Sequence, residues 1–339
     1  MLIMNPSKIS FMLMMMLGTL ISIMSNSWPA TWIGLEINLL SFIPLMYTKK
    51  NIFSSEASMK YFIIQALASS LMLIIIILST MIPNLIYNNS LMQSMTAIPL
   101  MMKMGAAPFH MWFPTVMEGL SWMNCLILMT WQKIAPMTIM SYLNIQSWLI
   151  YMTSIMSVMI GSIGGLNQTS TRKIMAYSSI NHMGWMILTM MMSEMLWQIY
   201  LTVYSIISLT LMIIFMNFSG NQMNQLMFKS KSPIMKAILL MNLLSLGGLP
   251  PFLGFLPKWL VIQLTIQQNS VAIILMMVLT TLITLFYYIQ LGMTTFMMNS
   301  NQMKWNHQKK MIINHNIIMT LSMISLFSLP LYSILFLIL

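Results

Sequence analysis

Residues 98–114 read IPLMMKMGAAPFHMWFP, an apolar run that contains Lys103, a Gly-Ala-Ala-Pro sequence at 105–108 and a further proline after it, Pro114. Proline removes an amide donor and disrupts the helical hydrogen bond to the preceding turn. Broken backbone at the depth of a membrane is tolerated only where protein or a water-filled cavity satisfies its polar groups. The stretch therefore predicts a membrane helix that is broken beside a buried lysine.

A second stretch repeats this pattern near the other end of the chain. Residues 250–257 read PPFLGFLP, and both copies contain Pro-Phe, an aromatic residue three positions after the Phe and a proline five positions after it. Gly105 and Gly248 each lie three residues before the proline of the Pro-Phe pair. Two broken segments at corresponding positions are typical of internal repeats in transporter-like membrane proteins.

The composition is that of a membrane protein throughout the chain. Of 339 residues, 58% are hydrophobic and only 6% are charged, whereas soluble domains average about 25% charged residues. Apolar stretches of about 20 residues, the length that crosses a bilayer, recur from end to end. We predict an all-α polytopic membrane protein that forms one transmembrane domain, residues 1–339, without a soluble domain or a cleaved leader. The eleven predicted spans are 8–25, 28–47, 60–82, 92–113, 121–142, 147–166, 174–193, 196–218, 235–264, 270–294 and 316–338.

The net charge of +11 would suit a nucleic-acid-binding protein, so the positions of the fifteen basic residues decide its meaning. Twelve of them precede the first predicted span or follow an even-numbered one, and the loops after odd-numbered spans contain no Lys or Arg. This positive-inside pattern predicts an inner N-terminus and, after eleven crossings, an outer C-terminus. It also explains the charge without a nucleic acid. The twelve are Lys8, Lys49, Lys50, Lys60, Arg172, Lys173, Lys229, Lys231, Lys236, Lys304, Lys309 and Lys310.

The three remaining basic residues, Lys103, Lys133 and Lys258, lie within apolar spans, and Glu36 and His182 lie near the middle of theirs. A charge at the bilayer centre costs about 2.5–3.5 kcal/mol on insertion scales, so these groups should face the protein interior. Burial disfavours charge, and a buried lysine can therefore exchange protons near neutral pH. We predict that the five residues form a charge or proton path. The alternatives are a buried Glu36–lysine pair that only fixes helix packing and a neutral His182 that only bonds neighbouring helices.

The two broken stretches also predict how the spans are organised. They lie in the fourth and ninth spans, five spans apart, and an odd separation gives the two copies opposite orientations in the membrane. We therefore expect two inverted five-helix repeats, about 8–142 and about 147–294, followed by a C-terminal span at about 316–338. Proline kinks alone are common in membrane helices, but their repetition beside charged residues favours a functional role.

Three stretches together resemble one known family: KMGAAPFHMWFPTVMEG at 103–119, TRKIMAYSSINHMGW at 171–185 and LLSLGGLPPFLGFLPKW at 243–259. The chain resembles, over essentially its full length, the subunit 2 family of mitochondrial NADH:ubiquinone oxidoreductase, respiratory complex I. That resemblance implies an antiporter-like subunit of the membrane arm with eleven spans. It also implies that Glu36 and Lys103 are the coupled pair of a first half-channel. Lys133 is then the central lysine, Lys258 the lysine of a second half-channel, and His182 a member of the central polar axis.

The implied function is proton translocation coupled to the oxidation of NADH by ubiquinone. The sequence has no Walker loop, no Rossmann glycine fingerprint and no cysteine cluster. We therefore expect no cofactor and no metal in this chain, with NADH, FMN, iron-sulfur clusters and ubiquinone on other subunits. Expected partners are the other membrane-arm subunits and the lipid bilayer, including cardiolipin. The expected location is the mitochondrial inner membrane, with the N-terminus on the matrix side and the C-terminus on the intermembrane-space side.

Two other classes of function fit the same residues. The inverted repeat alone would suit a self-contained cation/proton antiporter, and shuttling without partner proteins would favour that interpretation. The chain would be a structural membrane-arm subunit if pumping were normal after loss of the lysines. Cys125, the single cysteine, is interpreted as a helix-packing residue, and the 47 methionines form no spaced clusters that would indicate a copper pathway.

Overall fold

The computed structural model describes residues 6–48, 51–81, 89–218, 222–223 and 233–297, together with 319–320, 322–323 and 325. These residues are helical or lie in turns and short connections, apart from one isolated β-bridge between Ser170 and Gln222. The prediction of an all-α membrane protein is confirmed. Most of the predicted eleventh span, 316–338, lies outside the described residues, as do seven loop lysines: Lys49, Lys50, Lys229, Lys231, Lys304, Lys309 and Lys310.

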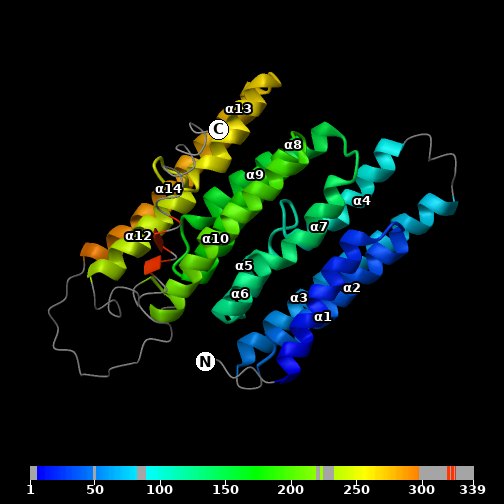
Figure 1. Ribbon diagram of the computed structural model, residues 1–339, viewed down its shortest axis with the longest axis horizontal. Coiled ribbons are helices and arrows are strands. Elements are labelled where there is room, and N and C mark those ends of the chain that lie inside the picture. The colour runs from blue at the N-terminus through cyan, green and yellow to red at the C-terminus, as the bar shows by residue number, and fades with distance from the viewer. Residues whose placement is uncertain are drawn as a thin grey trace. The chain divides into compact units, whose positions relative to one another are not determined.

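The helices follow the predicted spans in order (Figure 1). Among the described residues, six stretches are long and apolar enough to cross a membrane: α1, α2, α3, α8, α10 and the Val271–Thr294 part of α14. The remaining spans are either interrupted or more polar. The bounds are α1 Pro6–Met24, α2 Trp28–Met46, α3 Ile52–Met81, α4 Asn89–Met104, α5 Trp112–Gly119, α6 Trp122–Met129, α7 Trp131–Ser141, α8 Ser147–Gly165, α9 Thr171–Met190, α10 Glu194–Phe218, α12 Pro233–Gly247, α13 Phe255–Gln267 and α14 Val271–Met297.

Four predicted spans differ in detail from the helices. The third was expected to begin at residue 60, but α3 begins at Ile52, and an exposed ion pair at 2.6 Å joins Glu56 to Lys60 one turn later on this helix. The fourth and ninth spans are each divided into two helices at the expected breaks. The fifth span, expected to be continuous from 121 to 142, is divided at Thr130 into α6 and α7.

The chain divides into two compact units, residues 1–157 and residues 158–339, and each is described by itself. In the first unit α2 packs against α1 and α3, and α7 packs against α1, α2, α4 and α6. The contact between α1 and α2 is close because both helices present glycine there. A Cβ atom at Gly34 would lie 2.6 Å from the Ser22 amide nitrogen and 2.9 Å from the Gly18 oxygen.

In the second unit the most enclosed helix is α9, in which every residue from 178 to 189 is buried. It packs against α10 and α13, and Gly161 of α8 lies against its backbone, where a Cβ atom would be 2.6 Å from the Asn181 amide nitrogen. Most buried helices are apolar all round, yet this one carries Ser178, Ser179 and His182 in its enclosed part. Polar groups on α9 are therefore placed inside protein rather than in lipid.

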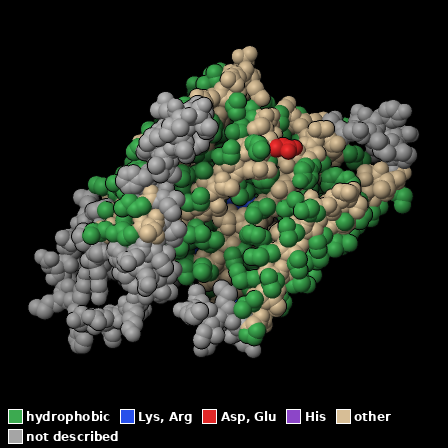
Figure 2. All heavy atoms as spheres, viewed as in Figure 1, with side chains coloured by type: hydrophobic (Ala, Val, Ile, Leu, Met, Phe, Trp, Pro, Cys, Tyr) green, Lys and Arg blue, Asp and Glu red, His purple; other side chains and the backbone are tan. Residues whose placement is uncertain are grey.

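The exterior of the described residues is largely apolar. Figure 2 shows hydrophobic side chains over much of the visible face, with very few charged groups among them. Leu13, Leu17 and Leu20 of α1, for example, are each at least half exposed. Soluble monomers rarely present apolar surfaces of this extent, which agrees with a chain whose outer helix faces contact lipid or neighbouring membrane proteins.

Candidate functional site

The two predicted breaks are built by the same backbone device. Gly105 and Gly248 adopt left-handed conformations, with φ of 71° and 80°, which glycine adopts without a steric penalty. Each glycine follows the last residue of a helix and creates the paired bonds of a Schellman cap. The cap bonds run from Gly105 and Ala106 to Met102 and Met101, and from Gly248 and Leu249 to Ser245 and Leu244, at 3.1–3.4 Å.

The three predicted lysines and the predicted histidine are all buried. Exposure is 7% for Lys103, 2% for Lys133, 6% for Lys258 and 5% for His182. Burying charged side chains is costly unless they are paired or bonded. The surroundings of each group therefore show what the arrangement can do.

Lys258 lies just beyond the second break, in the first turn of α13. Its Nζ donates a hydrogen bond of 2.7 Å to the carbonyl oxygen of Gly247, the last residue of α12. That carbonyl lies among the last of its helix, which lack helical donors and carry the negative end of the helix dipole. The Nζ atom also lies 5.9 Å from the ring centroid of Trp185 on α9. The break thus supplies the polar partner for the lysine.

Glycine is required at position 248 for a second reason besides the left-handed backbone conformation. A Cβ atom at this position would lie 2.8 Å from Cδ and 3.0 Å from Nζ of Lys258. The lysine side chain therefore lies directly against the backbone of the broken segment. Only a residue without a side chain permits this close approach.

Lys103 lies in the last turn of α4, immediately before the first break. The helix-end carbonyls there are bonded by other side chains: Gln65 Nε2 donates to the Lys103 oxygen and Trp112 Nε1 donates to the Met102 oxygen, both at 3.2 Å. The amine of Lys103 itself has no hydrogen-bond partner among the described residues. It lines a small cavity of about 10 Å³ with side chains of Leu35, Asn38, Leu39, Tyr61, Gln65, Gln132 and Pro136.

Glu36 acts electrostatically on Lys103 without touching it. The structure gives an electrostatic interaction between the two groups, but no direct ion pair joins them within the described chain. The Oε2 atom of Glu36 is buried without a hydrogen-bond partner. The two predicted partners are therefore neighbours in the first unit, separated by a gap.

Lys133 lies in α7, close to a helix interruption that we did not predict. The helix stops at Met129 and restarts at Trp131, and Pro136 removes a further helical bond one turn beyond the lysine. The Lys133 Nζ lies 5.5 Å from the ring centroid of Phe113 on α5. The helix that carries Lys133, α7, packs against both α2, which carries Glu36, and α4, which carries Lys103. Pro136 was the sequence signal closest to this interruption.

His182 has two tyrosine neighbours that we did not predict. Its Nδ1 lies 2.9 Å from the hydroxyl of Tyr200, and its ring centroid lies 5.0 Å from that of Tyr204. Both tyrosines are buried on α10, one helical turn apart. In the sequence, the i, i+4 spacing of these two tyrosines in an apolar helix was the signal that could have indicated them. Thus the first unit holds Glu36, Lys103 and Lys133, and the second holds His182 and Lys258.

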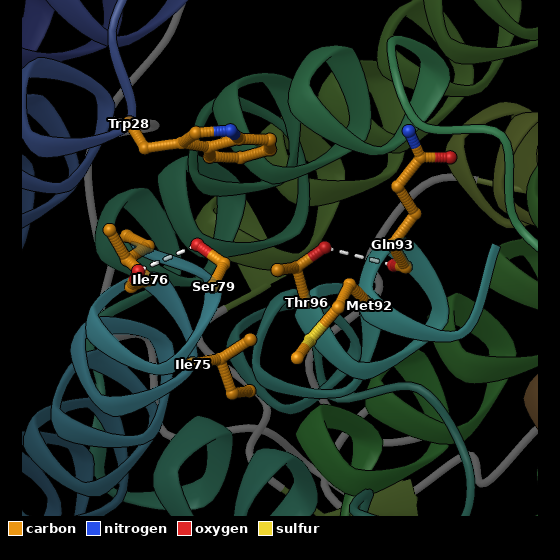
Figure 3. Close-up of a pocket in the computed structure, with 7 residues that line it drawn as sticks. All are labelled: Trp28, Ile75, Ile76, Ser79, Met92, Gln93 and Thr96. Carbon is orange, nitrogen blue, oxygen red and sulfur yellow. Dashed lines mark hydrogen bonds between the residues drawn. The ribbon is translucent and has the colours of Figure 1, made fainter. Parts of the chain in front are cut away.

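A surface groove elsewhere in the first unit contains none of these residues. It has a volume of about 160 Å³ and lies where α2 begins, α3 ends and α4 begins (Figure 3). The hydroxyls of Ser79 and Thr96 are already bonded to carbonyl oxygens of their own helices. In the described ranges no cluster of three or more His, Cys, Asp or Glu side chains suits a metal ion.

Comparisons with known proteins place the chain in a family. Residues 25–284 match the family described as NADH:quinone oxidoreductase/Mrp antiporter, TM. Over 299 residues the chain is 53% identical to NADH-ubiquinone oxidoreductase chain 2 of Anopheles gambiae, covering 87% of each. Over 334 residues it is 49% identical to the Aedes aegypti protein of that name, covering 97% of this chain and 98% of the relative.

The fold is also found among solved structures. A chain of respiratory complex I from Thermus thermophilus, solved with bound aureothin, superposes with a TM-score of 0.80 at 22% identity. The match covers 96% of this chain and 80% of that chain. The resemblance inferred from the three sequence stretches is confirmed. This chain therefore belongs to the NADH:quinone oxidoreductase/Mrp antiporter family, and its relatives within that family are NADH-ubiquinone oxidoreductase chain 2 proteins.

Proposed function

We propose that this chain is a proton-translocating, antiporter-like subunit of the membrane arm of respiratory complex I. It couples the oxidation of NADH by ubiquinone, which occurs on other subunits, to proton transfer across the mitochondrial inner membrane. The names of its relatives support the assignment to this complex. The observation that carries the proton-transfer role is the burial of three lysines, two of them at matching helix breaks.

The proposed proton path consists of Glu36, Lys103, Lys133, His182 and Lys258. Glu36 stabilises the charged form of Lys103 when the two approach, and their separation favours release of the proton toward Lys133. In the second half, His182 and Lys258 carry the proton onward. The gap between Glu36 and Lys103 and the bond of Lys258 to the end of α12 support this scheme. An external drive is required, since redox cofactors are assigned to the partner subunits.

The proposed topology has eleven spans: two inverted five-helix repeats, about 8–142 and about 147–294, and a C-terminal span at about 316–338. The shared Schellman caps at the two breaks support the repeat. The N-terminus lies on the matrix side and the C-terminus on the intermembrane-space side. The proposed contacts are other membrane-arm subunits, lipid and cardiolipin, and this chain itself holds no cofactor.

Two measurements test the proposal. On native gels of gently solubilised inner membranes, this chain should migrate within a large assembly that has NADH-dehydrogenase activity. In membrane vesicles, Lys258→Met should leave the complex assembled but reduce NADH-driven pumping severalfold, since removal of a costly buried charge need not destabilise the fold. A free 39 kDa species that exchanges cations for protons in proteoliposomes would instead identify a self-contained antiporter. Normal pumping by Lys258→Met would assign that lysine to structure.

A further inference from the structure

His182 and Tyr200 form a buried hydrogen-bonded pair inside the second unit. His182 lies on α9 and Tyr200 on α10, two helices that pack against each other. Only 5% of the histidine and 1% of the tyrosine is exposed, and Nδ1 of His182 lies 2.9 Å from the Tyr200 hydroxyl oxygen. Burying a polar hydrogen without an acceptor is costly, so the surroundings restrict where the hydrogens of this pair lie.

There are two ways to place the hydrogen between these atoms. A neutral imidazole has one nitrogen that donates and one that accepts, whereas a tyrosine hydroxyl can do either. If Nδ1 donated, the hydroxyl oxygen would accept and the hydrogen of the hydroxyl would need another partner. Among the described residues, the Tyr200 hydroxyl has no hydrogen bond except the one to His182. The hydroxyl therefore donates and Nδ1 accepts.

This placement decides the state of the whole imidazole ring. The nitrogen that accepts carries no hydrogen, so in a neutral ring the hydrogen lies on Nε2. Such a ring has one lone pair that could take up a proton, on Nδ1, and the Tyr200 hydroxyl occupies it. Neither nitrogen of His182 is thus open to an incoming proton in this conformation. To open Nδ1, the hydroxyl hydrogen has to turn away from the ring, and it then loses its acceptor.

The pair lies on the face of α9 that leads to Lys258. Trp185 follows His182 by three residues, and side chains with this spacing are neighbours on a helix surface. The Nζ atom of Lys258, on α13, lies 5.9 Å from the ring centroid of Trp185. From α10, the ring of Tyr204 packs on His182, with centroids 5.0 Å apart. A restriction on His182 therefore acts close to the lysine of the second break.

We propose that Tyr200 is a positioning residue that closes His182 to protons: its hydroxyl holds the imidazole neutral, with the hydrogen on Nε2, until the hydroxyl turns away from Nδ1. A proton delivered by the first half of the path then forms the Nδ1–H bond, and the imidazolium gives up its Nε2 proton toward Lys258. One proton enters the ring and one leaves it. The inference rests on the proposed function, because it assigns Tyr200 to the control of proton entry into the second half.

The functional test removes only the hydroxyl of the tyrosine. Tyr200→Phe keeps the ring and its packing but cannot donate to Nδ1, so His182 accepts protons at times when the parent histidine does not, and protons slip back through the path. In membrane vesicles we expect fewer protons pumped per NADH than in the parent, with NADH oxidation per assembled complex at or above the parent rate. A proportional fall of pumping and oxidation, or an unchanged ratio of protons to NADH, overturns the closing role.

Ser208→Ala is the matched control on the same helix. Ser208 is fully buried about two turns beyond Tyr200, and in the described chain its hydroxyl bonds only the Ser205 oxygen of α10, at 3.1 Å. Loss of this hydroxyl should leave the ratio of protons to NADH unchanged. An equally lowered ratio in Ser208→Ala would show that any buried hydroxyl on α10 has the effect, and the assignment to Tyr200 would then be wrong.

The position of the ring hydrogen can also be measured directly in the intact complex. With isotopically labelled histidine nitrogens, solid-state NMR gives the signal of His182 as the difference between the parent and His182→Gln. We expect a protonated Nε2 and a hydrogen-bonded Nδ1 without a hydrogen. A hydrogen on Nδ1 contradicts the proposal even if Tyr200→Phe does not assemble.

His182→Gln separates this inference from the proposed function. Glutamine has no titrating group, so the proposed path predicts severely reduced pumping by this variant. If His182→Gln pumps normally, His182 is not in the path and the role of Tyr200 is lost with it. If His182→Gln fails to pump while Tyr200→Phe keeps the parent ratio of protons to NADH, the path stands and the closing role of Tyr200 is wrong.

Discussion

At the scale of single residues, Lys103 allows charge and proton exchange to be separated. Arginine keeps the positive charge near Glu36 but effectively never deprotonates. We expect Lys103→Arg to give an assembled complex whose NADH-driven pumping is at least about tenfold below that of the parent, and Lys103→Ala to be similarly impaired. Pumping by inner-membrane vesicles, normalised to assembled complex, is the measurement. If Lys103→Arg pumps like the parent while Lys103→Ala does not, the lysine is a structural charge.

The two break glycines provide a matched pair at the same scale. Alanine in a left-handed conformation costs about 1–2 kcal/mol, so Gly105→Ala and Gly248→Ala should lower thermal stability by similar amounts. At Gly248 the added Cβ also displaces the Lys258 side chain, whereas at Gly105 its nearest neighbour is the Phe113 ring, 3.2 Å away. We therefore expect a severalfold larger loss of pumping per assembled complex for Gly248→Ala. Equal losses would show that the contact with Lys258 does not matter.

Residues differ in how clearly a sequence reveals them. Lys103, Lys133 and Lys258 could be identified because a charge in an apolar span is costly and therefore rare. Tyr200 and Tyr204 could not, since an uncharged polar side chain is tolerated in a membrane helix whether or not it contacts a titratable group. The sequence could not show that Glu36 and Lys103 are separated either. The order of their spans predicts that the two residues are neighbours but gives no distance between them. These roles depend on three-dimensional packing.

At the scale of helices, the tightest contact in the first unit gives a further prediction. Gly34→Val places a branched side chain where even a Cβ atom would lie within 3 Å of the α1 backbone, and backbone cannot move aside as a flexible side chain can. Separation of α1 from α2 should lower the amount of assembled complex at least severalfold, as measured on native gels. Ile33→Phe is the control, because Ile33 on the same helix is 47% exposed. Loss of assembly in both variants, or in neither, would contradict the proposed role of the glycine contact.

The helix breaks show why elements are only partly predictable. The breaks after Met104 and Gly247 could be predicted because glycine and proline act locally and mark both positions. The interruption at Thr130 has no such residue at the site, and its nearest signal, Pro136, lies inside the following helix. Likewise, α3 begins at Ile52, and its first two turns contain the polar residues Ser54, Ser55, Glu56 and Ser58, so an apolar window underestimates its length. Glycine and proline mark a break at their own positions, whereas the interruption at Thr130 and the start of α3 carry no such mark.

At the scale of the whole molecule, function requires partners that this chain does not contain. The exposed apolar helix faces need lipid or neighbouring subunits to cover them, and the proposed proton path needs an external drive. Close helix packing in membranes depends on shape rather than on a hydrophobic force between helices. The chain is therefore understood as one part of a larger membrane assembly, to which we propose that it contributes the buried titratable groups on its interrupted helices.

The proposed topology can be tested in the assembled complex with cysteine labelling. The single cysteine, Cys125, is fully buried, so a membrane-impermeant maleimide should leave the parent chain unlabelled. Asn26 and Asn144 lie in exposed connections that follow α1 and α7, and Asn51 and Asn167 in exposed connections that follow α2 and α8. The positive-inside pattern assigns the first pair to the outer side and the second pair to the inner side.

In inside-out vesicles we expect labelling of Asn51→Cys and Asn167→Cys at least about tenfold faster than labelling of Asn26→Cys and Asn144→Cys, because an intact bilayer excludes a polar reagent from the far side. In right-side-out vesicles the order should reverse. Labelling after detergent solubilisation is the control for positions shielded by neighbouring subunits. Asn26 and Asn51 flank a single helix, so labelling of both from one side would mean that α2 does not cross the membrane. The sidedness inferred from the basic residues, and with it the inverted repeat, would then be wrong.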